Sequence, residues 1–242
     1  MKKMTKFFAL ALLAGAMVSC STEDTAPSTQ NDKVAVQFTG GISVNTRAAG
    51  VAWADGDRIG IFMTGANQTL SADAIQEGVD NVCYQSNGSI AFSPISGGKT
   101  IFFPIDGDVD FYSYYPQTTV NDYKVALDVT DQTKQETIDF MYAKTEGCNK
   151  ATPQVVLKFY HKLSNLVLDV QPGNGLTQED LKKMTVTVKG QNTKATFNLV
   201  DGTISGEENP ADITMKTTEA GKLYEAILLP TEEASRVIEF DL

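Results

Sequence analysis

Apolar and polar residues alternate along most of this chain, which is the period of β-strands with one buried face. At its start, Val34, Val36 and Phe38 alternate with small or polar residues, and Gly40-Gly41 is expected to stop that strand before residues 42–44 resume the pattern. The alternation predicts strands at 34–44, 58–63, 79–85, 89–92, 99–103, 109–115, 123–129, 138–143, 155–169, 185–188, 195–199, 213–215, 223–229 and 237–242.

Turn signals separate these strands at short intervals. Ser86-Asn87-Gly88 and Asp201-Gly202 each join two strand-like runs and predict hairpins, because Asn and Gly tolerate the positive φ of tight turns. One helix-like stretch covers residues 176–184, where Thr177 and Asp180 have the spacing of a capping box. Many short strands with turns between them are typical of β-sandwiches.

We therefore predict an all-β protein with two sandwich domains, residues 33–152 and residues 153–242, and a seam near Pro153.

The first residues have the features of an export signal. Three lysines precede an apolar run from Phe7 to Val18, which is too short to span a bilayer, because a spanning helix needs roughly 20 residues. Small residues then lead into Cys20, which is the arrangement that a lipoprotein signal peptidase recognises. Residues 1–19 are predicted to be a lipoprotein signal peptide and Cys20 the lipidated start of the mature protein. The alternative is an ordinary signal peptide cleaved near Ser19.

Residues 20–32 are polar and unpatterned. They have too little apolar surface to offset the entropy lost on ordering, so they are predicted to be a flexible tether.

The chain is acidic, with 30 Asp and Glu against 20 Lys and Arg and a formal net charge of −10. An acidic protein repels phosphates, which argues against nucleic acid and anionic lipid surfaces as partners. Besides Cys20, the cysteines are Cys83 and Cys148, and their spacing suits no metal site. They could pair in an oxidising compartment. Two free thiols are favoured, because Cys83 lies in a predicted strand and Cys148 in a predicted loop.

Residues suited to catalysis or metal binding are sparse. His161 is the single histidine, and it has no nucleophile elbow or carboxylate set at recognisable spacing, so a structural or surface role is predicted. Two acidic stretches, at residues 55–57 and 106–110, resemble fragments of calcium loops but lack the distal glutamate, so tight turns are predicted there. We predict no enzyme, no cofactor and no metal site.

An aromatic group in the first half has two interpretations. Its tyrosines could stack on sugar rings, as in glycan-binding modules. Alternatively, Phe111 and its alternates fill the core while the tyrosines cover the rim with their hydroxyls in water, and this interpretation is favoured. The group consists of Phe102, Phe103, Phe111, Tyr112, Tyr114 and Tyr115.

Several short motifs follow one another along the chain. They are the lipoprotein signal, Thr46-Arg47-Ala48, the stretch from Trp53 to Ile61, the stretch from Phe111 to Pro116, the stretch from Asp139 to Ala143, and the stretch from Leu157 to Leu166. In that order they resemble the fimbrillin-like lipoproteins, the subunits of type V pili. The resemblance covers nearly the whole chain, and its specificity lies in the ordered set. The acidic pair after Cys20, Glu23-Asp24, also resembles the surface-export signal of lipoproteins from some Gram-negative gut bacteria.

The resemblance implies two transthyretin-like (Greek-key) β-sandwich domains in tandem and export as a lipoprotein of the cell outer membrane. It also implies assembly into a fimbrium, or display as an adhesin with a host-surface or glycan ligand. A trypsin-like protease is expected to cut after Arg47, so that Ala48 begins the processed chain and the lipid leaves with the first strand. A strand from another pilus subunit would then fill the vacated groove. The alternative is that Arg47 is an ordinary loop residue and the protein stays anchored.

Two further expectations follow. A rival function is a non-polymerising surface lipoprotein that captures glycans for an uptake system with its tyrosine-rich strand. The chain stops inside an alternating strand at residues 236–242, where members of the family continue with further strands. We expect either a C-terminally truncated product or an open sheet edge that another chain completes.

Overall fold

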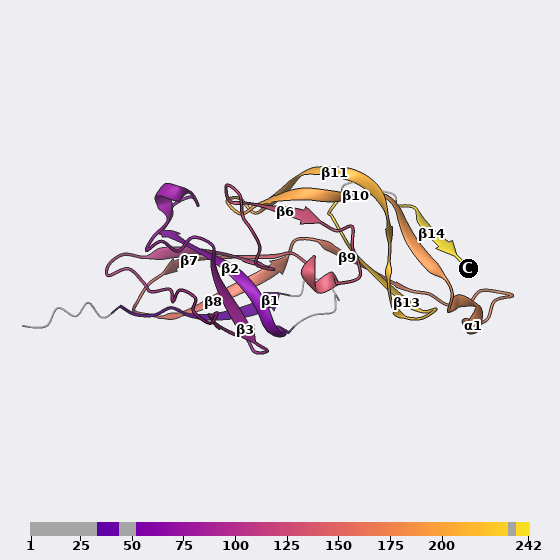
Figure 1. The fold of residues 1–242 in the computed structure, drawn as a ribbon, viewed down its shortest axis with the longest axis horizontal. Coiled ribbons are helices and arrows are strands. Elements are labelled where there is room, and N and C mark those ends of the chain that lie inside the picture. Colours follow the sequence, from indigo (N-terminus) through magenta and orange to yellow (C-terminus); the bar gives the residue numbers. More distant parts are fainter. Residues whose placement is uncertain (1–32, 44–51, 232–235) are drawn as a thin grey trace, which may run out of the picture. The chain divides into compact units, whose positions relative to one another are not determined.

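Strands are the main regular structure of this protein (Figure 1). The computed structural model describes residues 33–43, 52–231 and 236–242. The strands are β1 (Gln37–Ser43), β2 (Asp55–Gly65), β3 (Val82–Asn87), β4 (Ala91–Pro94), β5 (Val109–Tyr115), β6 (Lys124–Asp128), β7 (Met141–Cys148), β8 (Gln154–His161), β9 (Ser164–Asp169), β10 (Thr185–Asn198), β11 (Thr203–Thr214), β12 (Lys216–Glu219), β13 (Leu223–Leu228) and β14 (Ile238–Asp241).

Helical structure in these described ranges is confined to α1 (Gln178–Leu181) and the 3₁₀ turns η1 (Ala72–Ala74) and η2 (Gln135–Thr137). The predicted all-β class is therefore confirmed. Within the same ranges, no helix combines the length and the apolar character needed to cross a membrane.

Seven strands close into a barrel in the order β1, β4, β3, β2, β5, β7 and β8. Strand β1 completes the barrel, because it pairs antiparallel with β4 on one side and parallel with β8 on the other. A β-sandwich was predicted here, so the closed barrel differs from the expectation. Alternation identifies the buried face of a strand but does not identify the neighbour on each edge. Closure gives each of the seven strands a partner on both sides.

Aromatic side chains dominate the barrel core, the cluster of buried residues inside the barrel. Phe38 of β1 meets Tyr84 of β3 and Phe111 of β5 edge to face, with ring centroids 5.3 and 5.1 Å apart. Edge-to-face pairs add a favourable electrostatic contribution to the burial of the rings. Other members of the core are Ile59, Ile61, Met63, Ile101, Phe103, Leu157 and Phe159.

The remaining strands form two further sheets, one in the order β11, β10, β14 with β6 also paired to β10, and one in the order β12, β13, β9. The predicted seam at Pro153 falls between β7 and β8, which are both barrel strands. The chain passes to another sheet later, at Lys162 and Leu163, between β8 and β9. Residues 33–242 form one compact unit.

Strand β5 is buried on both faces, and all seven of its residues belong to the interior. Phe111 belongs to the barrel core, whereas Tyr112 and Tyr114 belong to a second core that also contains apolar residues of β6, β10 and β13. The hydroxyl of Tyr114 donates to the carbonyl oxygen of Thr118 over 2.7 Å. The prediction that these tyrosines form a wet rim is therefore wrong. Their buried rings also lack the open face that stacking on a sugar requires.

Several local predictions are confirmed. β3 and β4 form one predicted hairpin, and β10 and β11 form the other. α1 is shorter than predicted, but Thr177 and Asp180 make both reciprocal bonds of a capping box. The prediction of a strand at residues 99–103 is wrong, because this segment forms a single β-bridge, between Phe102 and Ala35.

Candidate functional site

Strand β1 is the element through which the barrel closes, and its two edges are bound unequally. β1 pairs with β4 at Phe38 and Thr39. Toward β8 it is in register at every position from Gln37, opposite Gln154, to Ser43. On its other side β8 is in register with β7 only at its end, in the pairs that include Tyr160 and His161. Loss of β1 would therefore leave most of one β8 edge with unpaired N–H and C=O groups.

The side chains of β1 alternate between the barrel core and solvent. Phe38 is only 2% exposed, whereas Gln37 is exposed. Strand β1 continues through Gly40 and Gly41 to Ser43, so the prediction that the glycines stop the strand is wrong. Glycine is compatible with extended backbone, and the parallel pairing with β8 holds the segment in that conformation.

Trp53 links β1 to the rest of the barrel core. Its indole Nε1 donates to the carbonyl oxygen of Gly40 over 2.8 Å. The ring lies edge to face against Phe92, Phe159 and Tyr115, with centroid distances of 5.0, 5.2 and 5.3 Å. Trp53 follows the predicted cleavage position in the sequence, whereas β1 precedes it. The hydrogen bond thus joins the two segments that such a cut would separate.

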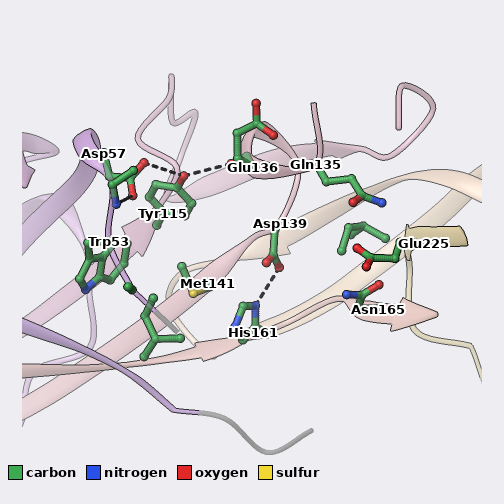
Figure 2. Close-up of a pocket in the computed structure, with 14 residues that line it drawn as sticks. Trp53, Asp57, Tyr115, Gln135, Glu136, Asp139, Met141, His161, Asn165 and Glu225 are labelled. Carbon is green, nitrogen blue, oxygen red and sulfur yellow. Dashed lines mark hydrogen bonds and ion pairs between the residues drawn. The ribbon is translucent and has the colours of Figure 1, made fainter. Parts of the chain in front are cut away.

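A pocket of about 260 Å³ lies beside Trp53 and Tyr115, and four carboxylates are among its lining residues, those of Asp57, Glu136, Asp139 and Glu225 (Figure 2). The hydroxyl of Tyr115 lies 3.0 Å from Asp57 Oδ1 and 3.1 Å from the carbonyl oxygen of Glu136. Burial raises the pKa of Tyr115, and the Asp57 carboxylate raises it further, so the phenol keeps its proton and acts as a donor. This network attaches β2 to the segment that precedes β7.

A second pair of residues that line the pocket is His161 and Asp139, with His161 Nδ1 2.8 Å from Asp139 Oδ1 (Figure 2). The hydrogen bond to Asp139 raises the pKa of His161, and this effect outweighs the opposing effect of burial. The pair connects the end of β8 to the residues just before β7. A structural role for the histidine stays a prediction.

The acidic stretches lie where two strands begin: residues 55–57 open β2, at a shift in its register against β3, and residues 109 and 110 open β5 after a bend at residues 105–107. Asp57 Oδ2 accepts from the backbone N–H of Ala54 over 2.7 Å. Asp110 is buried and accepts from the backbone N–H groups of Asn67 and Gly147 over 2.8 and 2.9 Å. Among the residues that the structure describes, no three His, Cys, Asp or Glu side chains are grouped so that they could hold a metal ion.

The predicted site residues Cys20, Arg47 and Ala48 lie outside the described residues. Arg47 and Ala48 belong to the sequence between the end of β1 and Trp53. Sequence reasoning identified this linker but missed Gly40 and Trp53 as the residues that meet across it. The tryptophan could have been found, because one aromatic residue in an otherwise small and acidic turn usually packs against a core.

Both remaining cysteines are free thiols, as predicted. Cys83 lies in β3, and Cys148 is the last residue of β7 and not a loop residue. Burial raises the pKa of both thiols, which keeps them in the less reactive protonated form.

Comparison with known proteins gives consistent matches. The sequence profile described as fimbrillin-like matches residues 46–242. The protein named "Putative fimbrium subunit Fim1C" from Bacteroides uniformis is 37% identical over 238 residues, covering 91% of this chain and 73% of that protein.

Crystal structures with a similar fold include two from Bacteroides species. A "putative cell adhesion protein" from Bacteroides uniformis superposes with a TM-score of 0.72 at 35% identity, covering 86% of this chain and 80% of that one. A second protein of the same description, from Bacteroides ovatus, has a TM-score of 0.67 at 26% identity, covering 86% of this chain and 82% of that one.

Proposed function

Because the chain belongs to the fimbrillin-like family, we propose that it is a fimbrial subunit or adhesin at the cell surface, without a catalytic role. The observation that carries this proposal is the position of β1. This strand lies before Arg47 in the sequence, yet it completes a barrel whose other six strands all follow Arg47. A single cut in the linker would therefore separate one barrel strand from the rest.

The route to the surface begins with residues 1–19 as a lipoprotein signal peptide and Cys20 as the lipid-bearing residue. Residues 20–32 form a polar tether between the lipid and β1. The basic start, the short apolar run and the small residues before Cys20 support this assignment. The lipid holds the subunit at the outer membrane until processing.

Cleavage after Arg47 makes Ala48 the first residue and frees β1 together with the lipid anchor. When β1 leaves, the residues of β8 between Gln154 and Tyr160 lose their partner strand, and the position of Phe38 in the barrel core becomes empty. A strand donated by another pilus subunit restores both the backbone pairing and the buried side chains. The partners are thus other subunits, joined by strand exchange. The tandem of transthyretin-like sandwiches is the finer part of this proposal. It is supported in the second half, where the sheet with β10 and the sheet with β13 both contribute side chains to the second core.

The test is the N-terminus of the protein on intact cells, measured by mass spectrometry in the wild type and in Arg47→Ala. We expect the wild type to begin at Ala48 and to enter high-mass polymer, and Arg47→Ala to keep a lipidated Cys20 and stay monomeric. Arg58→Ala is the matched control, because Arg58 is an exposed arginine on β2 and should leave processing unchanged. A lipidated Cys20 in the wild type as well would refute processing.

A further inference from the structure

The space between β4 and β8 that β1 fills is here called the β1 slot. At one position of the strand that fills it, no side chain fits. A Cβ added to Gly40 would lie 2.6 Å from Phe92 Cε2, 3.2 Å from Trp53 Nε1 and 3.4 Å from Phe159 Cε2. The first distance is shorter than a carbon–carbon contact allows, and three packed rings surround the site. For the adjacent Gly41, an added Cβ would meet nothing within 4 Å. The requirement for glycine is thus local to one residue.

The same position carries a fixed hydrogen bond. Trp53 is 5% exposed, and its indole N–H reaches the carbonyl oxygen of Gly40. If β1 leaves, the indole stays with the barrel and loses its acceptor. A buried donor without an acceptor is costly, so an incoming strand is favoured when it places a carbonyl at this point. Close approach of that backbone to the indole again requires the absence of a side chain.

Two residues earlier, the slot accepts a large ring. Phe38 fits between Tyr84 and Phe111 in edge-to-face contacts. Tyr84 is itself held in place, because its hydroxyl accepts from the backbone N–H of Ile101 over 2.8 Å. The ring position faces Val155 of β8, and the glycine position faces Leu157. The slot therefore presents an aromatic site and a glycine site two residues apart.

We infer that the β1 slot selects its occupant by register. It takes a strand that runs parallel to β8, with an aromatic residue opposite Val155 and glycine opposite Leu157. The inference rests on the proposed strand exchange and specifies the chemistry of the donated segment. In the printed sequence an aromatic residue stands two positions before a glycine only at Phe38 and Gly40. A slip of two residues would drive a side chain into Phe92, so β1 fits its own slot in one register.

The test uses the full chain after an arginine-specific protease has cut it, with the new start at Ala48 verified by mass. The cut protein is incubated with excess fluorescein-labelled peptide of residues 33–43, in the native form and with Gly40→Ala or Gly41→Ala. Capture is followed by fluorescence anisotropy and by the emission of Trp53, the single tryptophan. The Gly41→Ala peptide should bind within about twofold of the native peptide, and the Gly40→Ala peptide about tenfold more weakly or worse.

Equal capture of the two alanine peptides would overturn the register inference while leaving strand exchange intact. Failure of the native peptide to enter, with β1 still bound, contradicts the exchange itself. In that case the intact chain decides the glycine requirement through the urea midpoints of Gly40→Ala and Gly41→Ala. A lower midpoint for Gly40→Ala alone supports the inference, and equal midpoints reject it.

Discussion

Truncation of Phe38 to alanine measures how much β1 contributes to the folded state. The ring is 2% exposed and lies against Tyr84 and Phe111 with centroids about 5 Å away. Its removal loses the transfer free energy of the side chain and leaves a cavity bounded by rigid rings, which together cost about 3–5 kcal/mol of unfolding free energy. That is a large share of the roughly 5–15 kcal/mol that stabilises a typical domain.

The assay is urea unfolding followed by the fluorescence of Trp53, which lies in hydrogen-bond contact with β1 and therefore reports on this strand. Gln37→Ala is the matched control, because Gln37 is the exposed neighbour on the same strand, and its effect should be within about 0.5 kcal/mol. If Phe38→Ala costs less than about 1 kcal/mol, or no more than the control, β1 does not belong to the cooperative barrel core.

Two predictions concern other parts of the structure. The contact with Asp139 raises the pKa of His161, so their pairing stabilises the folded state fully below the unfolded pKa of about 6.5. This stabilisation is lost as the pH rises through the raised pKa of the folded state. The urea midpoint should therefore fall over that pH range in the wild type and change little in Asp139→Asn. Tyr114→Ala should lower the unfolding free energy by about 3–5 kcal/mol, because the ring is fully buried; a stable variant that had lost binding on a glycan array would contradict this assignment.

The elements that were predicted well are those with local causes. β5 has the predicted bounds because a dense apolar and aromatic run ends at Pro116, which cannot continue the ladder. The capping box at Thr177 depends on residues three apart, and the hairpins depend on glycines adjacent in sequence to the strands they join. Each of these signals lies within a few residues of the structure that it determines.

Pairing between distant strands was not predictable in the same way. β8 follows β1 by more than a hundred residues, and period-two alternation contains no information about parallel partners. The pairing of β6 with β10, outside the barrel, was unpredictable for the same reason, because alternation does not identify the partner strand. The burial of β5 on both faces did have a signal, because a continuous aromatic run indicates a strand covered on both sides. That signal was interpreted as a core face and a wet rim because tyrosine hydroxyls tolerate water.

The candidate site shows the same division. Arg47 was identified from its neighbours in the sequence and from a family resemblance, whereas the contact between Gly40 and Trp53 exists only once the barrel closes. Gly40 and Gly41 are indistinguishable in the sequence, yet one has three rings around it and the other faces open space. Their packing environments differ, and only the fold supplies that difference.

The unequal pairing of β1 explains why its place would act as a template for another strand. β4 is also in register with β3 at three positions, so it would keep a partner after β1 had gone. β8 would keep only its end pairs with β7, and the backbone from Gln154 to Phe159 would face the vacant position. Water can satisfy those backbone groups, but it cannot replace Phe38 against Tyr84 and Phe111. The apolar deficit thus favours refilling by a strand, and the unpaired edge of β8 supplies backbone partners for it.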